Sequence, residues 1–164
     1  LTWGNGLQVG GGLLGLGGNF LPWRRLPPAV APLGVPQGLT QTQFDQAGRI
    51  IRSATGHLGD DVIVQGSRAA GTARPTSDID FAIRLSPEEF DAFVRARFGT
   101  PNPGSAKERT MQMAIQNGRV HAGEAGLRGV RRQLEEALGI KINISVIRRG
   151  GPFDQGPSIP VPRS

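Results

Sequence analysis

Apolar residues recur at regular spacing along the middle of the chain but not at its two ends. Phe44, Ala47 and Ile51 repeat at helical spacing, which is typical of a helix with one buried face. Val62-Ile63-Val64 is a short, wholly apolar run, as expected for a buried strand. Residues 78–85 alternate between polar and apolar, which predicts a strand with one face in the core.

The second half of the chain predicts three more helices and a last strand. Ser86 and Ser105 are each followed three residues later by Glu, a capping pattern that begins a helix. A third helix is expected over residues 124–138, and residues 140–147 alternate again as a strand. This order of elements predicts an α+β fold, with a small mixed sheet and helices packed on one of its faces.

Glycine and proline separate this central region from the two ends. The chain has 25 Gly and 13 Pro in 164 residues, concentrated in residues 1–38 and again after residue 150. We therefore expect a linker or remnant of a preceding region at 1–38, a folded domain at 39–150 and a Pro/Gly-rich tail at 151–164. Leu1 in place of Met predicts a fragment of a longer polypeptide. No apolar stretch is long enough to span a bilayer, so we expect no membrane insertion.

Charge and cysteine content narrow the choice of partners and sites. The formal net charge of +6 favours a phosphate-rich partner or an acidic protein, without choosing between them. The absence of cysteine excludes disulfides and thiolate metal sites. A metal in this protein would therefore have oxygen or nitrogen ligands.

The candidate chemistry lies between two neighbouring strands. The first strand leads into Gly66-Ser67, and the next opens with Asp78-Ile79-Asp80. Alternation places the carboxylates of Asp78 and Asp80 on one face, with Cα atoms roughly 6.6 Å apart at about 3.3 Å per residue. Such a pair can hold Mg²⁺. Gly66 allows close approach of a phosphate and Ser67 adds a hydroxyl, so the whole unit suits an NTP with its metal.

The sequence from Gly66 to Phe81 resembles the signature of the polymerase-beta-like nucleotidyltransferase superfamily, in particular the minimal nucleotidyltransferases and their antibiotic-modifying relatives. The resemblance implies transfer of a nucleoside monophosphate from an NTP to an acceptor, with Mg²⁺ bound by Asp78 and Asp80. Arg68 beside the Gly-Ser turn is a further candidate for phosphate binding. A salt bridge to a local carboxylate is the alternative for Arg68, as it is for Arg74.

Members of that superfamily have a third carboxylate on a later strand, and the matching position here is Asn143. An amide oxygen can coordinate a metal, but it brings no charge and cannot act as a base. Three alternatives follow: a slow enzyme, a natural pseudo-enzyme, or a deliberate change from Asp to Asn. The competing function is a catalytically impaired module that binds nucleotide or a partner without turnover.

A longer stretch, residues 66–157, is similar to the C-terminal toxin domains of bacterial polymorphic toxins. This similarity implies a protein that is secreted or delivered into a target-cell cytoplasm and that is bound by a cognate immunity protein. It favours RNA, tRNA especially, or a protein as the acceptor. Antibiotic modification is disfavoured, because a basic chain suits a polycationic drug poorly.

Two further groups of residues have competing interpretations. Arg128, Arg131 and Arg132 cluster on one predicted helix, where they form either a track for an RNA backbone or a solvated face; we favour the solvated face. His57 and His121 are the only histidines. Neither has a recognisable partner in the sequence, and we expect surface or helix-cap roles for both.

Overall fold

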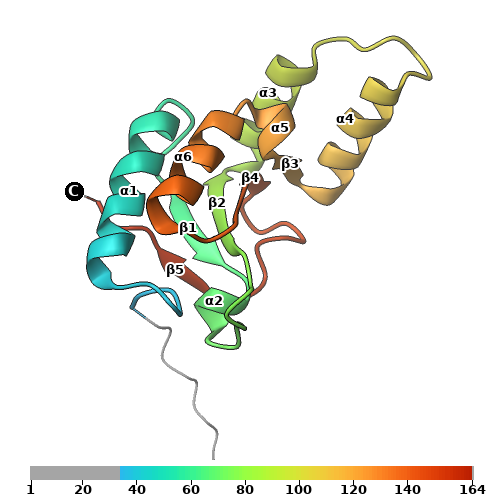
Figure 1. Ribbon diagram of the computed structural model, residues 1–164. Helices are drawn as coiled ribbons and strands as arrows, with labels where there is room; N and C mark the ends of the chain where they lie inside the picture. Colours follow the sequence, from blue (N-terminus) through green and yellow to red (C-terminus); the bar gives the residue numbers. More distant parts are fainter. Residues whose placement is uncertain (1–33, 164) are drawn as a thin grey trace, which may run out of the picture. The chain divides into compact units, whose positions relative to one another are not determined.

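Five strands form one mixed sheet in the order β3–β4–β2–β1–β5 in the computed structural model, which describes residues 34–163 (Figure 1). β2 and β4 are parallel, and the other neighbouring strands are antiparallel. The strands are β1 (Val62–Gln65), β2 (Ile79–Leu85), β3 (Arg119–His121), β4 (Ile142–Arg148) and β5 (Ser158–Pro160). The predicted α+β fold with a small mixed sheet is confirmed.

Helices begin where the capping signals predict. Thr40 and Ser86 form capping boxes, and the Ser105 hydroxyl accepts a hydrogen bond from the Glu108 amide. The helices are α1 (Gln41–Thr55), α2 (Ser67–Ala70), α3 (Pro87–Phe98), α4 (Ala106–Asn117), α5 (Ala122–Ala125) and α6 (Arg128–Leu138). The single helix predicted over residues 124–138 is wrong. Gly126 adopts a left-handed conformation with φ +75° and ends α5 before α6 begins.

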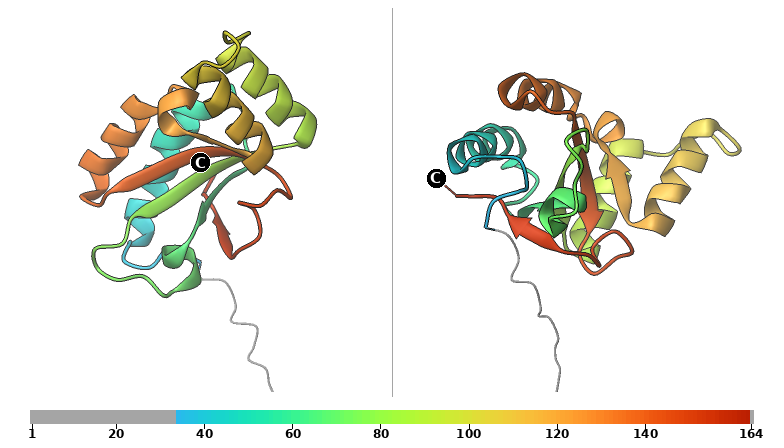
Figure 2. Two further views of the ribbon diagram at one scale, coloured as in Figure 1. Left: turned by 90° about the vertical axis from the view of Figure 1, so that its right-hand side faces the viewer. Right: turned by 60° about the horizontal axis from the view of Figure 1, so that its bottom comes forward.

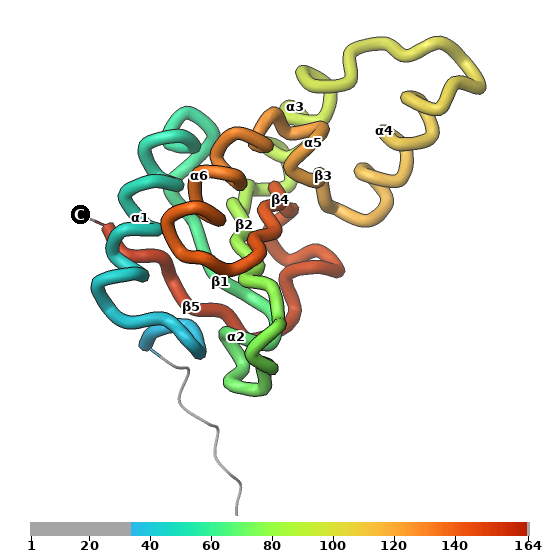
Figure 3. Tube along the Cα trace, viewed as in Figure 1, coloured from blue at the N-terminus to red at the C-terminus, as the bar shows by residue number. Residues whose placement is uncertain are grey.

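The two faces of the sheet have different surroundings. Apolar residues at alternate positions of β2 and β4, such as Phe81 and Ile144, face a core that includes residues of α1 and α6. Those two helices lie side by side on that face (Figure 2). The other face, here called the open face, carries Asp80 and Asn143 and is crossed by residues 149–157 (Figure 3). The predicted packing of helices on one face is confirmed.

The predicted end of the domain at residue 150 is too early. β5 lies within the expected tail and pairs with β1, and Ile159 and Val161 are buried in the core. Arg52 of α1 donates hydrogen bonds to the carbonyls of Val161 (2.7 Å) and Pro162 (2.9 Å). A three-residue edge strand between prolines has too little alternation to be recognised in the sequence.

The predicted start at residue 39 also needs a small correction. The Gln37 amide donates to the carbonyl of Arg68, and the Arg68 guanidinium donates to the carbonyl of Gln37. The Gln37 side chain makes two hydrogen bonds with the backbone of Ala73. Most of the expected linker, residues 1–33, lies outside the described residues. Within residues 34–163 no helix combines the length and apolar character needed to cross a membrane.

Removing the side chain of Ile159 tests whether β5 belongs to the folded domain. Ile159 is 2% exposed, so Ile159→Ala should lower the free energy of unfolding by about 2–4 kcal/mol in urea denaturation. The matched control is Ile115→Ala on α4, where the side chain is 43% exposed and the expected change is below about 0.5 kcal/mol. Equal effects of the two substitutions would mean that β5 contributes no core packing.

Candidate active site

Strand register aligns three polar side chains across the open face. Gln65 of β1 pairs with Asp80 of β2, and Asp80 pairs with Asn143 of β4. Asp78 immediately precedes β2, two residues from Asp80. The parallel pairing of β2 with β4 therefore brings together residues that are more than sixty positions apart in the sequence.

The amide of Asn143 bridges the two carboxylates. Its nitrogen, Nδ2, donates to Asp78 Oδ2 at 2.9 Å and to Asp80 Oδ1 at 3.1 Å. Two nearby carboxylates repel each other, and hydrogen bonds to a charged group contribute about 1.5–3 kcal/mol each. An Asp at position 143 would remove both donors and add a third negative charge. The amide therefore offsets part of the repulsion within the carboxylate pair.

Two features of the turn require glycine at position 66: its backbone conformation and the close approach of Asp80. Its φ is +78°, in the region that favours glycine, and a Cβ at this position would clash with the carboxylate of Asp80. The turn places Ser67 at the first position of α2. The amides of Ala69 and Ala70 donate to the Gly66 carbonyl, which leaves the amides of Ser67 and Arg68 without an intrahelical partner.

Arg68 has a different position from the one expected of a phosphate ligand. The side chain is 4% exposed, and its guanidinium donates only to backbone carbonyls. Ser77 O accepts from Nε (3.0 Å) and Nη2 (2.8 Å), and Gln37 O accepts from Nη1 (2.7 Å). The alternative, a salt bridge to a carboxylate, is not found for Arg68 within residues 34–163 either. Arg68 instead fixes the end of the loop immediately before Asp78.

An open cavity of about 550 Å³ adjoins the carboxylates. We call it the hydroxyl cavity, because four of its side chains carry a hydroxyl; it is lined by Ser67, Thr72, Arg74, Thr76, Ser77, Asp78, Asp80 and Asn143. Hydroxyl donors and one exposed arginine are suited to phosphate oxygens. The lining therefore offers donors for phosphate oxygens next to the carboxylate pair.

The donor set beside this cavity fits a hard divalent cation. Carboxylate and amide oxygens are ligands that Mg²⁺ accepts, together with water and phosphate oxygens. Within residues 34–163 no group of three or more His, Asp or Glu side chains could hold a metal, so a cation here would have two carboxylates as its charged ligands. Asn143 would have to turn its amide to present its oxygen in place of the nitrogen that now faces Asp78 and Asp80.

Comparison with protein families matches this region. The sequence model of the nucleotidyltransferase domain covers residues 49–154, well over half of the chain. The chain belongs to the nucleotidyltransferase domain family. Comparison with curated proteins and comparison with solved structures each gave no match. The matched range contains the Gly66-Ser67 turn, both carboxylates and Asn143. Nucleotidyl transfer is therefore the general activity that the family supports.

Two residues on the open face of this nucleotidyltransferase domain were not expected beside the site: Arg119, and His121, for which a surface or helix-cap role was predicted. His121 pairs with Ser145, and Arg119 pairs with Ile147, so both side chains share the face of Asn143. β3 is only three residues long, and its alternation is too short to be recognised. His121 precedes α5, but its side chain makes no capping hydrogen bond. Burial lowers the pKa of His121 and nearby Arg119 lowers it further, against the smaller opposite effect of Glu124.

The segment that crosses the open face is anchored by ion pairs. Arg84 of β2 binds Asp61 (3.0 Å) on one side and Asp154 (3.2 Å) on the other. Burial alone would raise the pKa of Asp61, but hydrogen bonds from Arg84 and Arg149 outweigh burial and lower it. Asp154 also accepts a hydrogen bond from the Gly150 amide. These contacts hold residues 150–154 over the sheet of the nucleotidyltransferase domain.

Replacing Gly66 with alanine tests its contact with Asp80. Gly104 is a matched control, because its φ of +79° is nearly the same but a Cβ there meets open space. Gly104→Ala should cost about 1–2 kcal/mol from the left-handed backbone alone. Gly66→Ala should cost at least about 1 kcal/mol more, because its ψ of −159° lies in a region that almost only glycine adopts and because the added methyl group displaces the carboxylate. Equal losses in urea denaturation would contradict this account of the turn.

Proposed function

We propose that this protein transfers a nucleoside monophosphate from an NTP to an acceptor hydroxyl in a reaction that requires Mg²⁺. The observation that carries the proposal is the convergence of Asp78, Asp80 and Asn143 at one end of the hydroxyl cavity. Family membership supports the reaction type. The Gly-Ser turn beside the carboxylates supports binding of the triphosphate.

Each group of residues has a separate role in this proposal. Ser67 and the first amides of α2 contact phosphate oxygens, as does the guanidinium of Arg74. Asp78 and Asp80, with the turned amide of Asn143, hold Mg²⁺. When bound, Mg²⁺ offsets the negative charge of the phosphate oxygens as the reaction proceeds. Gly66 keeps the turn close to Asp80, so that the triphosphate and the carboxylates lie together.

The reaction forms one bond and breaks another at the α-phosphorus. The acceptor oxygen bonds to that phosphorus, and pyrophosphate leaves with the electron pair of the broken bond. The acceptor proton passes to water, because the amide of Asn143 cannot accept it. Positioning and charge stabilisation are then the main contributions of the protein, as in phosphoryl transfer generally.

A nucleotide-binding module without turnover is the second candidate function. The two hydrogen bonds from Asn143 favour it, because they stabilise the carboxylates without any cation. A site that no longer turns over could retain such an arrangement. This candidate predicts nucleotide binding without release of pyrophosphate.

The acceptor and the biological role form a further part of the proposal. We propose RNA or protein as the acceptor, in a toxin that is secreted or delivered, acts in the target-cell cytoplasm and is bound by an immunity protein. The similarity of residues 66–157 to polymorphic toxin domains supports this role. The net charge of +6 supports a phosphate-rich acceptor or an acidic immunity protein.

The direct experiment supplies NTPs labelled at the α-phosphate, with Mg²⁺ and a total cell extract. We expect label to enter RNA or protein, and pyrophosphate to be released in equal amount. Asp80→Asn, or chelation of Mg²⁺ with EDTA, should abolish incorporation. Incorporation that persists in Asp80→Asn would contradict the assigned site, and nucleotide binding without incorporation would favour the second candidate.

Asn143→Asp separates a weakened enzyme from a binding module. The substitution removes two hydrogen bonds and adds a charge, so the metal-free protein should melt at a lower temperature than the parent. Mg²⁺ should raise the melting temperature more in the variant, and transfer should increase by at least about tenfold as a base is restored. Differential scanning fluorimetry and the labelled transfer assay measure the two effects.

Asn143→Ala is the control for this comparison. It removes the same hydrogen bonds without adding a charge or a base. We expect it to lose stability without gaining a larger response to Mg²⁺ or any activity. If Asn143→Asp is as inactive as Asn143→Ala, the protein is a binding module.

A further inference from the structure

A second cavity meets the hydroxyl cavity at Asn143. We call it the basic cavity; it measures about 210 Å³ and is lined by Arg119, His121, Ala122, Gly123, Glu124, Arg128, Arg131, Asn143 and Ile144. Three arginines face a single glutamate in this lining. Because Asn143 lines both cavities, a group bound in the basic cavity lies next to the end of the polyphosphate site.

Two of these arginines carry a charge that no carboxylate of residues 34–163 neutralises. Arg128 and Arg131 make no ion pair with any residue in the described part of the chain. The guanidinium of Arg128 packs over Gly123, where an added Cβ would lie only 2.8 Å from Nη2. Both residues lie at the N-terminal end of α6, where the helix dipole disfavours cations. A bound anion would offset this unfavourable charge.

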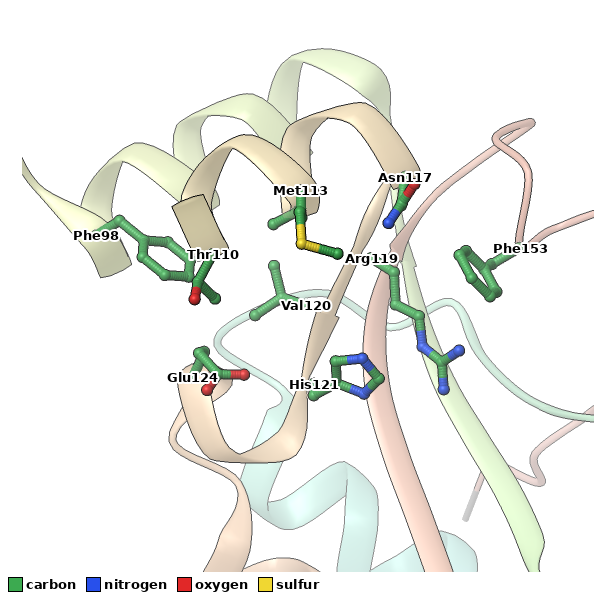
Figure 4. A pocket seen from close by; sticks show the side chains of 10 residues that line it. Phe98, Thr110, Met113, Asn117, Arg119, Val120, His121, Glu124 and Phe153 are labelled. Atoms are coloured by element: carbon green, nitrogen blue, oxygen red, sulfur yellow. The ribbon is translucent and has the colours of Figure 1, made fainter. Parts of the chain in front are cut away.

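A smaller apolar cavity adjoins the basic cavity (Figure 4). It measures about 140 Å³, and Arg119, His121 and Glu124 line both cavities. Its other walls include the rings of Phe98 and Phe153 and the side chain of Met113, which is 59% exposed. Aromatic rings and a thioether form a surface that suits a flat heterocycle.

Arg119 lies at the junction of the two cavities. Its guanidinium carbon is 4.5 Å from the centroid of the Phe153 ring. Its Nε is buried and has no hydrogen-bond partner within residues 34–163. Arg119 therefore brings a positive charge to the junction of the two cavities, where a ligand with both an anionic group and a planar ring would meet it.

We propose that the basic and apolar cavities bind the terminal nucleotide of a nucleic-acid strand, which serves as the acceptor. Arg128 and Arg131 contact its phosphate, the apolar cavity holds its base, and its terminal hydroxyl points towards Asn143. The inference rests on the proposed function, since it names the acceptor of that reaction. A phosphorylated serine or threonine offers the anion but no planar ring, so the pair of cavities favours a nucleotide.

Binding of a short strand without turnover tests this inference. The probe is a six-nucleotide RNA with a 5′ dye and a free 3′ hydroxyl, measured by fluorescence anisotropy in EDTA without NTP. The variant is Arg128→Gln with Arg131→Gln, and the control is Arg95→Gln with Arg132→Gln, which removes the same charge from exposed helix positions outside both cavities. The variant should bind at least about tenfold more weakly than the parent, while the control binds nearly as tightly.

Salt dependence distinguishes direct phosphate contact from a general effect of charge. Loss of two contacts should make the slope of log K against log salt shallower by about 1.4 in the cavity variant but not in the control. Equal weakening in both double variants, or none in either, would overturn the inference. Melting temperatures of both variants verify that they are folded.

Three further probes identify the part of the ligand that is bound. A strand with an abasic 3′ nucleotide should bind more weakly, and Phe153→Ala should reduce this difference; no effect of the base would overturn the apolar half of the site. Comparing RNA with DNA of the same sequence shows whether the protein distinguishes ribose from deoxyribose. Binding of either strand supports the inference. A phosphoserine peptide that binds in the same arginine-dependent way, while both strands fail, would overturn it.

The failure of this inference and the failure of the proposed function give different results. Arginine-dependent strand binding without any label transfer would contradict the reaction and leave the binding site intact. Label transfer that is insensitive to Arg128 and Arg131 would contradict the acceptor site and leave the reaction intact.

Discussion

Repulsion between Asp78 and Asp80 is the constraint on which the site depends. Their charges must be offset, and in this protein the offset is the amide of Asn143, which donates to both at 2.9 and 3.1 Å. That contact requires β4 to lie parallel to β2 in one register. A shift by one residue would turn Asn143 into the core and an isoleucine towards the carboxylates. The stability of the site and the pairing of the central strands are therefore linked.

Contacts with the backbone fix the two segments that lead to Asp78 and Asp80, which are the loop before Asp78 and the turn at Gly66. Buried Arg68 binds the carbonyl of Ser77, the residue before Asp78, and Gly66 leaves no space between the turn and Asp80. A charge that is buried must be well hydrogen-bonded to be tolerated, and Arg68 satisfies this with four contacts to carbonyls. Arg68 positions the loop that ends at Ser77, and this loop contributes side chains to the lining of the hydroxyl cavity.

The sequence predicted the elements with strong periodicity and the residues of one motif. The shared face of Asp80 and Asn143 could be anticipated, because alternation along each strand fixes which residues lie on one face and the resemblance to nucleotidyltransferases matched position 143 to the third carboxylate. The burial of Arg68 could not, since its partners are carbonyls of residues that carry no sequence signal. β3 and β5 are too short for periodicity, and the cavity residues Arg119 and His121 were missed with β3. The position of Arg68 and the formation of β3 and β5 depend on tertiary contacts that the sequence pattern does not show.

The hydroxyl cavity and the basic cavity meet at Asn143, so this residue and the carboxylate pair form the centre of the account. The most direct test is the anomalous scattering of Mn²⁺ in crystals grown with a non-hydrolysable NTP analogue. The account predicts a peak in contact with Asp78 and Asp80, a turned Asn143 amide, and a triphosphate in the hydroxyl cavity. A triphosphate bound elsewhere, with the Asn143 nitrogen still donating to both carboxylates and no peak between them, would contradict it.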